Sequence, residues 1–368
     1  MRMLPLGALL LAQAMPYPAG DRAPTLEETR AGMGIPSRAD QRGQLDAVGF
    51  ASTAEQMKLV WDLSAEGPDP EKLGPLPPPG VLAAVSPHDD YLYAGRVYRR
   101  VLPLVTARTV VVVGVFHRYR TYRVRDRLVF DPYPTWRTPD GPVRVSELRE
   151  TLLERLPEGD VLRDANAHDS EHSVEAEVYW LRHIRPDVEI VPILVPATSF
   201  QRLTGFAERT GAALASWMRA HHRTLGKDVA IVISADAVHY GADFKHVPFG
   251  EGGVEAYTRA VDRDRDLLRK AFAGPLTVER ARTLYEAFVD PGDPDTYRLT
   301  WCGRFSIPFG MLLLRATSQA LGMPVPEGKP VAYATSVGAP ELRVRASGLG
   351  ETAPANLYHF VGYPAVVW

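Results

Sequence analysis

The strongest constraint on the fold is an almost entirely β-branched run, TVVVVGV at Thr109–Val115. Such a continuous apolar run is typical of a strand that is buried on both faces of a parallel sheet. Similar runs alternate along the chain with segments whose periodicity predicts helices. The expected strands are Val81–Pro87, Thr109–Val115, Val188–Pro196, Asp228–Asp236, Pro330–Ser336 and Leu357–Val367, and the expected helices are Ser52–Leu63, Ala94–Leu104, Val145–Leu156, Ser173–Ile184, Arg202–Arg223, Val254–Phe272, Thr277–Phe288 and Ile307–Leu321. This alternation predicts an α/β fold with a mainly parallel central sheet flanked by helices.

The first eighty residues have a different composition. They are rich in proline, glycine and charge and end in GPLPPPG at Gly74–Gly80. We therefore expect residues 1–80 to form an N-terminal arm on the surface and residues 81–368 to form one α/β domain. The first twenty residues resemble a secretory signal with a cleavage site near Ala14, but a misassigned start codon or a short amphipathic lead-in would explain them equally well. The expected location is accordingly the cytoplasm or, after export, the periplasm.

Composition and missing motifs exclude several classes of protein. The formal net charge is −2, which gives no basic face for nucleic acid, and no stretch of about 20 apolar residues predicts a membrane span. Cys302 is the single cysteine, so we expect no intramolecular disulfide. It could in principle bind a metal, but a small buried hydrophobe is the better interpretation of a lone cysteine before an apolar helix. The sequence also lacks GxGxxG after the first strand, GxxxxGK[ST] and GxSxG. Nucleotide-binding loops and a serine hydrolase are therefore not supported.

Four short segments each place a histidine near the end of an expected element. These segments are SPHDDYLYAG with His88, VVVGVFHRYR with His117, DSEHSVEAE with His172, and VISADAVHYG with His239. Loops at the carboxyl ends of the strands meet at one edge of an α/β sheet, where such folds build their sites. Imidazole is a common metal ligand. The equivalent places of His88 and His117 after two strands favour metal ligation, and the alternative is that each is a polar loop residue with ordinary hydrogen bonds.

Charged residues accompany these histidines. Asp89 and Asp90 follow His88 and are either ligands that compensate a cation or solvated aspartates of a polar loop. Glu171 and Glu175 flank His172 at a helix start, where the group is either a general base with its supporting carboxylates or a capping arrangement.

Two further segments leave similar alternatives open. Asp236 lies three residues before His239 and would either ligate, orient a ligand or cap a turn. Arg118 and Arg120, next to His117, would either bind an anionic group of a substrate or remain solvated.

Taken together, these segments resemble the Memo family, whose bacterial members are often called AmmeMemoRadiSam system protein B. The family's PHAGYxYxG motif reads PHDDYLYAG here, and its EHSxE motif is intact at Glu171–Glu175. The remaining matches are Gly114 with His117, WRTPDG at Trp136–Gly141, SADAVHYG at Ser234–Gly241, CGR at Cys302–Arg304, and VGY at Val361–Tyr363. The resemblance runs from about Val81 to near the C-terminus and implies the fold of class III, LigB-type extradiol dioxygenases.

The resemblance implies one metal site, with His88 and His117 as two ligands. LigB-type enzymes hold Fe(II) with two histidines and a glutamate, and in Memo proteins the third position can be a cysteine two residues after the aspartate of the SADAVHYG segment. That position is Val238 here, which cannot ligate. We therefore expect Asp90, Asp89 or Asp236 to complete the site.

The function implied is that of a non-haem metal-dependent enzyme, an Fe(II) oxidoreductase acting on a small, aromatic or phenolic molecule. Copper and zinc are the alternative metals. In this interpretation His172 is a general acid or base supported by Glu171 or Glu175, and His239 supports the site. A non-catalytic metal- or substrate-binding partner of a radical-SAM system and a metal-assisted hydrolase are the rival interpretations.

Overall fold

The structure is a computed structural model that describes residues 32–368, so the signal-like segment lies outside the described residues. Most strands of this part belong to one large mixed sheet. In spatial order its main strands are β1 (Gln41–Arg42), β6 (Thr135–Trp136), β7 (Val143–Val145), β9 (Glu189–Val195), β4 (Thr109–Val115), β10 (Val229–Ser234), β3 (Ala83–Ser86), β16 (Phe360–Val367), β15 (Glu327–Thr335) and β12 (Gly274–Pro275).

The centre of the sheet is parallel. Strands β7, β9, β4, β10 and β3 run in the same direction, whereas β16, β15 and β12 are antiparallel to their neighbours. The register aligns Val113 of β4 with Ile193 of β9 and Ile233 of β10. The α/β fold with a mainly parallel sheet is therefore confirmed, and the carboxyl ends of β3, β4 and β10 lie side by side.

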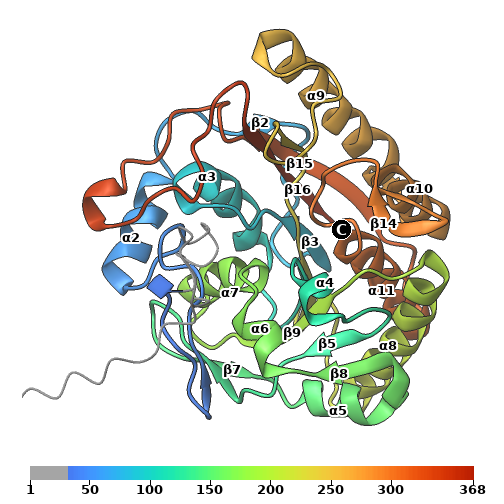
Figure 1. Cartoon of the computed structure of the whole chain (residues 1–368). Helices are drawn as coiled ribbons and strands as arrows, with labels where there is room; N and C mark the ends of the chain where they lie inside the picture. The colour runs from blue at the N-terminus through green and yellow to red at the C-terminus, as the bar shows by residue number, and fades with distance from the viewer. Residues whose placement is uncertain (1–31) are drawn as a thin grey trace, which may run out of the picture.

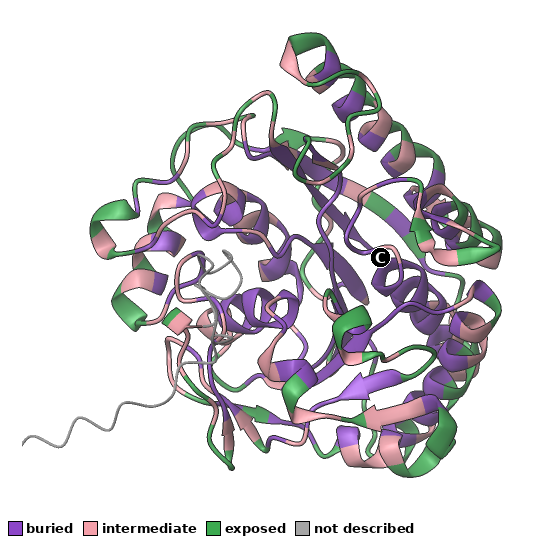
Figure 2. Cartoon of the chain, viewed as in Figure 1, coloured by how far each residue is buried: buried purple, intermediate pink, exposed green. Residues whose placement is uncertain are grey.

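Helices cover both faces of this sheet (Figure 1). Helices α3 (Tyr91–Val101) and α7 (Ser173–Ile184) pack on one face, and α8 (Phe200–Ala220) and α11 (Ser306–Leu321) pack on the other. Figure 2 shows the sheet and the inward sides of the helices buried, with exposed residues on their outer sides. The outer layer also contains α5 (Leu148–Arg155), α9 (Gly253–Leu267) and α10 (Val278–Phe288).

Several elements differ from the sequence-based expectation for local reasons. The segment expected as the helix Val145–Leu156 opens with strand β7, because Val143 and Val145 both face the core, and α5 starts only at Leu148. Pro103 ends α3 early and leaves a 3-10 turn, Leu102–Leu104. Short elements that carry no periodic signal are β2 (Glu71–Lys72), β5 (Leu128–Phe130), β8 (Val161–Arg163), β11 (His239–Tyr240), β13 (Val289–Asp290), β14 (Asp293–Tyr297), α4 (Tyr119–Tyr122), α6 (Ala165–Asp169), and two 3-10 turns at Glu158–Asp160 and Arg345–Ser347. The expected helix Val254–Phe272 consists of α9 followed by a π-helical turn at Leu268–Phe272.

The described part of the N-terminal arm is attached to the sheet at two places. Strand β1 pairs with β6 near one edge, and β2 pairs with β15 near the other. Between them α2 (Ala54–Leu63) begins with a capping box in which Thr53 and Gln56 exchange side-chain and backbone hydrogen bonds. Arg42 and Phe50 are almost fully buried. This segment therefore adds to the core as well as covering the surface.

No helix within residues 32–368 combines the length and the apolar character that a membrane span requires.

Candidate metal centre

A pocket of about 610 Å³ lies over the carboxyl ends of the central strands. Its walls include His88 after β3, His117 after β4 and Asp236 after β10. The start of α7 and the loop before α11 add further side chains, and the arm contributes Phe50. The pocket therefore lies at the edge of the sheet where the sequence predicts the site.

The hydrogen bonds of His88 fix which ring nitrogen faces the pocket. The Ser234 hydroxyl donates its one proton to the carbonyl of Ser173 at 2.7 Å, and Ser234 Oγ lies 2.7 Å from His88 Nδ1. Since that hydroxyl proton is already used, Nδ1 of His88 must be the donor to Ser234. The other nitrogen, Nε2, then carries a lone pair. Burial, followed by the neighbouring His117, lowers the pKa of His88 well below its usual value, which keeps the ring neutral.

His117 is oriented in the same way by a carboxylate. Glu171 accepts the His117 Nδ1 proton at 2.9 Å and the backbone N–H groups of His117 and Ser173 at 2.7 and 2.9 Å. Burial alone would raise the pKa of the Glu171 carboxyl, but His117 beside it and these hydrogen bonds hold that pKa far below its usual range. In the neutral form of this ring, Nδ1 carries the proton and Nε2 keeps the lone pair. This is the carboxylate–histidine–metal arrangement of many metal sites.

Cys302 completes the group. Its Sγ lies 3.4 Å from His88 Nε2, and the backbone N–H of Asp236 donates to it at 3.0 Å. The side chain is only 5% exposed, and burial raises the pKa of the thiol well above its usual value. A cation that a thiol ligates lowers this pKa again. The N–H bond from Asp236 would stabilise the resulting thiolate.

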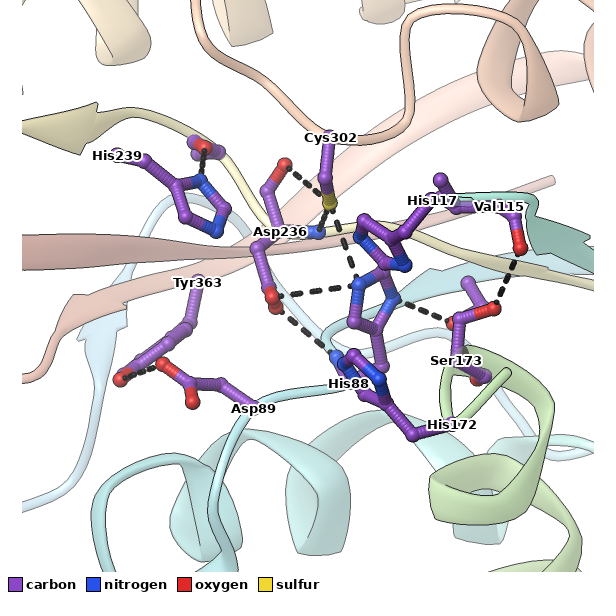
Figure 3. A network of polar contacts seen from close by, with 12 residues as sticks. His88, Asp89, Val115, His117, His172, Ser173, Asp236, His239, Cys302 and Tyr363 are labelled. Atoms are coloured by element: carbon purple, nitrogen blue, oxygen red, sulfur yellow. Dashed lines mark hydrogen bonds and ion pairs between the residues drawn. The ribbon is translucent and has the colours of Figure 1, made fainter. Parts of the chain in front are cut away.

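Three side chains from three different loops thus converge. One ligand atom each of His88, His117 and Cys302 lies within 4.8 Å of the others. Figure 3 shows the sulfur of Cys302 directed toward the imidazole rings, with Asp236 on the same side. Two imidazole nitrogens with lone pairs and one sulfur are a donor set that fits a transition-metal ion. Val238, which cannot ligate, is buried.

His172 and His239 lie on opposite sides of this group. The His172 ring stacks on His117 with a centroid distance of 5.0 Å, and its Nδ1 lies 3.9 Å from Glu171 Oε1. His239 donates from Nδ1 to the carbonyl of Ala237 at 3.1 Å, so its Nε2 is unprotonated. Burial lowers the pKa of His239 to about 4. Both rings line the pocket, where each can accept or donate a proton.

Asp236 is the aspartate nearest the sulfur. Its Oδ1 accepts the backbone N–H of His88 at 2.9 Å, and its Oδ2 lies 3.6 Å from His88 Nε2. Burial, followed by the charge of Asp89, raises the pKa of Asp236 well above its usual value. Asp236, His239 and Cys302 also form a group with metal-ligand spacing.

The two aspartates after His88 also line the pocket, but protein groups hold their carboxylates. The Tyr363 hydroxyl donates to Asp89 at 2.7 Å. The hydroxyl of Thr352 donates to Asp90 at 2.8 Å, and the arm passes so close that a Cβ on Gly49 would lie 2.0 Å from an Asp90 oxygen. Neither aspartate belongs to a group of metal-ligand spacing among the described residues.

Glu175 lies outside the pocket. It forms a buried ion pair with Arg42 and accepts the backbone N–H groups of Leu45 and Asp46, the latter at 3.0 Å. Although Glu175 follows Glu171 by one helical turn, it holds the arm and does not contact the histidines. The structure therefore brings together His88, His117, Glu171, His172, Asp236 and His239 but separates Glu175 from them.

Two functional candidates were missed from the sequence. For Cys302 the sequence favours packing over metal binding, because a lone cysteine before an apolar helix is usually a packing residue. Arg304, two residues later, lines the same pocket with its guanidinium carbon 3.3 Å from the centroid of the Tyr297 ring. The signal that could have found both is the Cys-Gly-Arg segment, which joins a thiol and a guanidinium in one turn before α11.

Comparisons with known proteins agree with the sequence motifs. The model of a family described as "Memo-like protein" matches residues 71–345. A MEMO1 family protein of Archaeoglobus fulgidus is 33% identical over 164 residues, which is 44% of this chain and 57% of the relative. MEMO1 family proteins of Thermococcus kodakarensis and Pyrococcus furiosus are 28% and 26% identical over 52% of this chain. The matches span about six tenths of these relatives' own lengths, 64% and 63% for the latter two.

Proposed function

This chain belongs to the Memo-like protein family, and from that premise we propose that it binds one transition-metal ion and acts with it on a small organic molecule. The ligands in this proposal are His88 Nε2, His117 Nε2 and Cys302 Sγ. The convergence of these three groups within 4.8 Å is the observation that supports it. Cys302 takes the third position that the sequence alone would assign to Asp90, Asp89 or Asp236.

The donor set limits the choice of metal. Thiolate and imidazole favour copper, zinc and iron, whereas Mg²⁺ and Ca²⁺ prefer oxygen ligands. Iron remains our first choice, because the chain resembles enzymes that use a non-haem Fe(II) ion. Such an ion, when bound, supplies one-electron chemistry and a position for a substrate oxygen. The proposed activity is that of a non-haem oxidoreductase.

The protein's own groups have separate tasks in this proposal. Ser234 and Glu171 hold the Nδ1 protons of His88 and His117, so both rings keep their lone pairs toward the ion. His172 borders the pocket and is 28% exposed, which suits a group that moves a proton to or from the substrate. Phe50 and Phe244 provide apolar walls for an aromatic or phenolic ring.

Metal analysis of protein purified without oxygen tests the proposal. We expect wild-type protein to bind about one equivalent of iron, copper or zinc, and Cys302→Ser to lower the affinity by more than about 100-fold, because a hard hydroxyl replaces a soft ligand. Asp89→Asn and Asp90→Asn should keep the wild-type stoichiometry. His221→Gln, on the surface away from the pocket, is the matched control for His88→Gln and His117→Gln.

Two results would contradict the proposal. Unchanged metal content in Cys302→Ser would show that the cysteine is not a ligand. Loss of metal in Asp90→Asn or Asp89→Asn would show that an aspartate is the third ligand. Oxygen uptake with a panel of catechols then separates an oxidoreductase from a protein that only binds metal.

A further inference from the structure

The turn that carries Cys302 also carries an arginine. Gly303 separates Cys302 from Arg304, and a Cβ on Gly303 would lie only 2.3 Å from the Cβ of Ala235. The turn is therefore pressed against the end of β10, where only glycine fits. Two residues span at most about 7 Å. The Cα atoms of Cys302 and Arg304 are therefore close enough for one small molecule to contact both side chains. Both side chains line the same pocket.

Arg304 has no acidic partner among residues 32–368. Its printed contacts are one long hydrogen bond from Nη1 to the carbonyl of Trp301, at 3.5 Å, and the face of Tyr297. By contrast, Arg120 and Arg125 each have an acidic partner, since they share the carboxylate of Asp295. Arg304 is also the one arginine or lysine among the described residues that line this pocket. A largely enclosed guanidinium without a counter-charge is unusual, because removing a charge from water is costly.

We propose that Arg304 binds the carboxylate of a small organic acid whose other end reaches the metal position. This inference rests on the proposed function, since it names the substrate class of the same pocket. Stacking on Tyr297 fixes the plane of the guanidinium and leaves its edge N–H groups for the ligand. A planar fork of this kind donates two parallel hydrogen bonds to a carboxylate.

Acidic residues of the same pocket restrict how such a molecule lies. Asp46, Asp89 and Asp90 line it, and each accepts hydrogen bonds from protein groups, including the backbone N–H of Gly49 and the Thr352 hydroxyl. Three carboxylates repel a second anion, so the acid group of the ligand belongs at the Arg304 end. The other end should be neutral and polar. A hydroxy-substituted aromatic acid satisfies both ends and the apolar walls.

Binding of matched ligand pairs by the full chain tests this inference. The pairs are 3,4-dihydroxybenzoate against catechol and benzoate against benzyl alcohol, measured by calorimetry or ligand-observed NMR with and without bound metal. We expect each acid to bind at least about tenfold more tightly than its neutral partner. Arg304→Gln should remove this preference and leave the affinity for catechol within about twofold.

Two further variants separate charge from structure. Arg304→Lys should retain part of the preference, because it keeps the charge but loses the fork. Arg298→Gln, an exposed arginine outside the pocket, should behave as wild type. Inorganic phosphate is the competing anion, and tighter binding of phosphate than of either acid at Arg304 would overturn the assignment to carboxylates.

Two other results of these binding measurements would overturn the inference. Equal affinity of acids and neutral partners in the wild type, including no measurable binding by any of them, would overturn the inference. So would an equal loss of both ligands in a folded Arg304→Gln protein, since that indicates a purely structural arginine. Metal content measured on the same samples shows whether the metal proposal has failed separately, because the carboxylate preference is also read in metal-free protein.

Discussion

Two buried carboxylates at the start of α7 show how one short motif can serve two regions of the molecule. Glu171 accepts hydrogen bonds from His117, whose side chain lines the pocket, whereas Glu175, one turn later, pairs with Arg42 of the arm. Both side chains are at most 1% exposed. Their partners differ in one respect. His117 keeps a second nitrogen for another ligand, and Arg42 has only donors.

This difference between His117 and Arg42 explains why only the pocket, and not the arm, has a group free to bind a ligand. An imidazole held through Nδ1 passes the effect of its carboxylate to whatever binds Nε2. An arginine whose donors are taken by Glu175 and by the carbonyls of His168 and Glu171 has nothing left to offer. The EHSVE segment therefore contains one residue that positions the site and one that anchors the arm. If substituting Glu175 altered metal binding, or substituting Glu171 loosened the arm, this division of roles would be wrong.

The largest effect is expected at the anchor. Glu175→Gln leaves the buried Arg42 guanidinium without its counter-charge and should lower the free energy of unfolding by about 3–5 kcal/mol. Urea unfolding followed by circular dichroism measures this loss.

The matched control is the double variant Arg42→Met with Glu175→Leu. Replacing both members of a buried ion pair by apolar residues is often neutral, so much of the stability should return. A Glu175→Gln protein as stable as the wild type would show that the ion pair does not hold the arm.

A third buried carboxylate, that of Asp264, sharpens the comparison because no arginine or lysine within residues 32–368 forms an ion pair with it. Asp264 accepts hydrogen bonds from Trp301 Nε1 and the Tyr333 hydroxyl, both at 2.7 Å, and from the backbone N–H of Val238 at 3.2 Å. Burial raises the pKa of Asp264 to about 6 from its usual 3.8, despite these donors. These neutral donors and the charge of Arg263, which forms no ion pair with Asp264, do not compensate the buried charge.

The sign of the resulting pH dependence follows from this upward shift. Between pH 4 and 6 the unfolded chain has already lost the Asp264 proton, whereas the folded chain still holds it. Ionisation therefore favours the unfolded state as the pH rises, by up to about 3 kcal/mol once the pH exceeds 6. We expect the stability of wild type relative to Asp264→Asn to fall by about 2–3 kcal/mol between pH 4 and pH 7, because part of the effect is already lost at pH 4. Urea unfolding of both proteins across this range tests it, and a constant difference would contradict the shift.

Much of the fold could be predicted because it depends on local patterns. The run Thr109–Val115 is strand β4 to the residue, and Ser173–Ile184 is helix α7. The two-residue strands could not be predicted, since β1 and β2 contain only polar residues and form through pairing with distant strands. The division of the chain at residue 80 stays a prediction, although Arg42 and Phe50 contribute to the core.

The candidate site was predictable only in part, for a similar reason. Histidines at strand ends converge because parallel strands place their carboxyl ends together. Cys302 comes from a loop that lies 66 residues after Asp236, and no periodicity brings the two together. Their contact depends on the packing of Gly303 against Ala235. Glu171 and Glu175 were indistinguishable in sequence because the partner that separates them, Arg42, lies in the arm.

The smallest effect, and the sharpest contrast, is expected at Glu171. In Glu171→Gln one amide N–H would face the backbone N–H of His117, so the hold on the imidazole weakens while the ring itself remains. The metal affinity should fall about 10- to 100-fold, which is the usual effect of losing a carboxylate behind a ligating histidine. Competition with a chelator of known affinity measures this change.

Glu175→Gln is the control for this last experiment, since it is the same substitution one turn away on the same helix. If the partner decides the role, Glu171→Gln should change metal affinity more than stability, and Glu175→Gln should do the reverse in the fraction of protein that stays folded. Equal effects of the two variants on both quantities would mean that the start of α7 acts as a single structural unit. The pocket and the arm would then not be separable, and the different partners of the two glutamates would have no functional meaning.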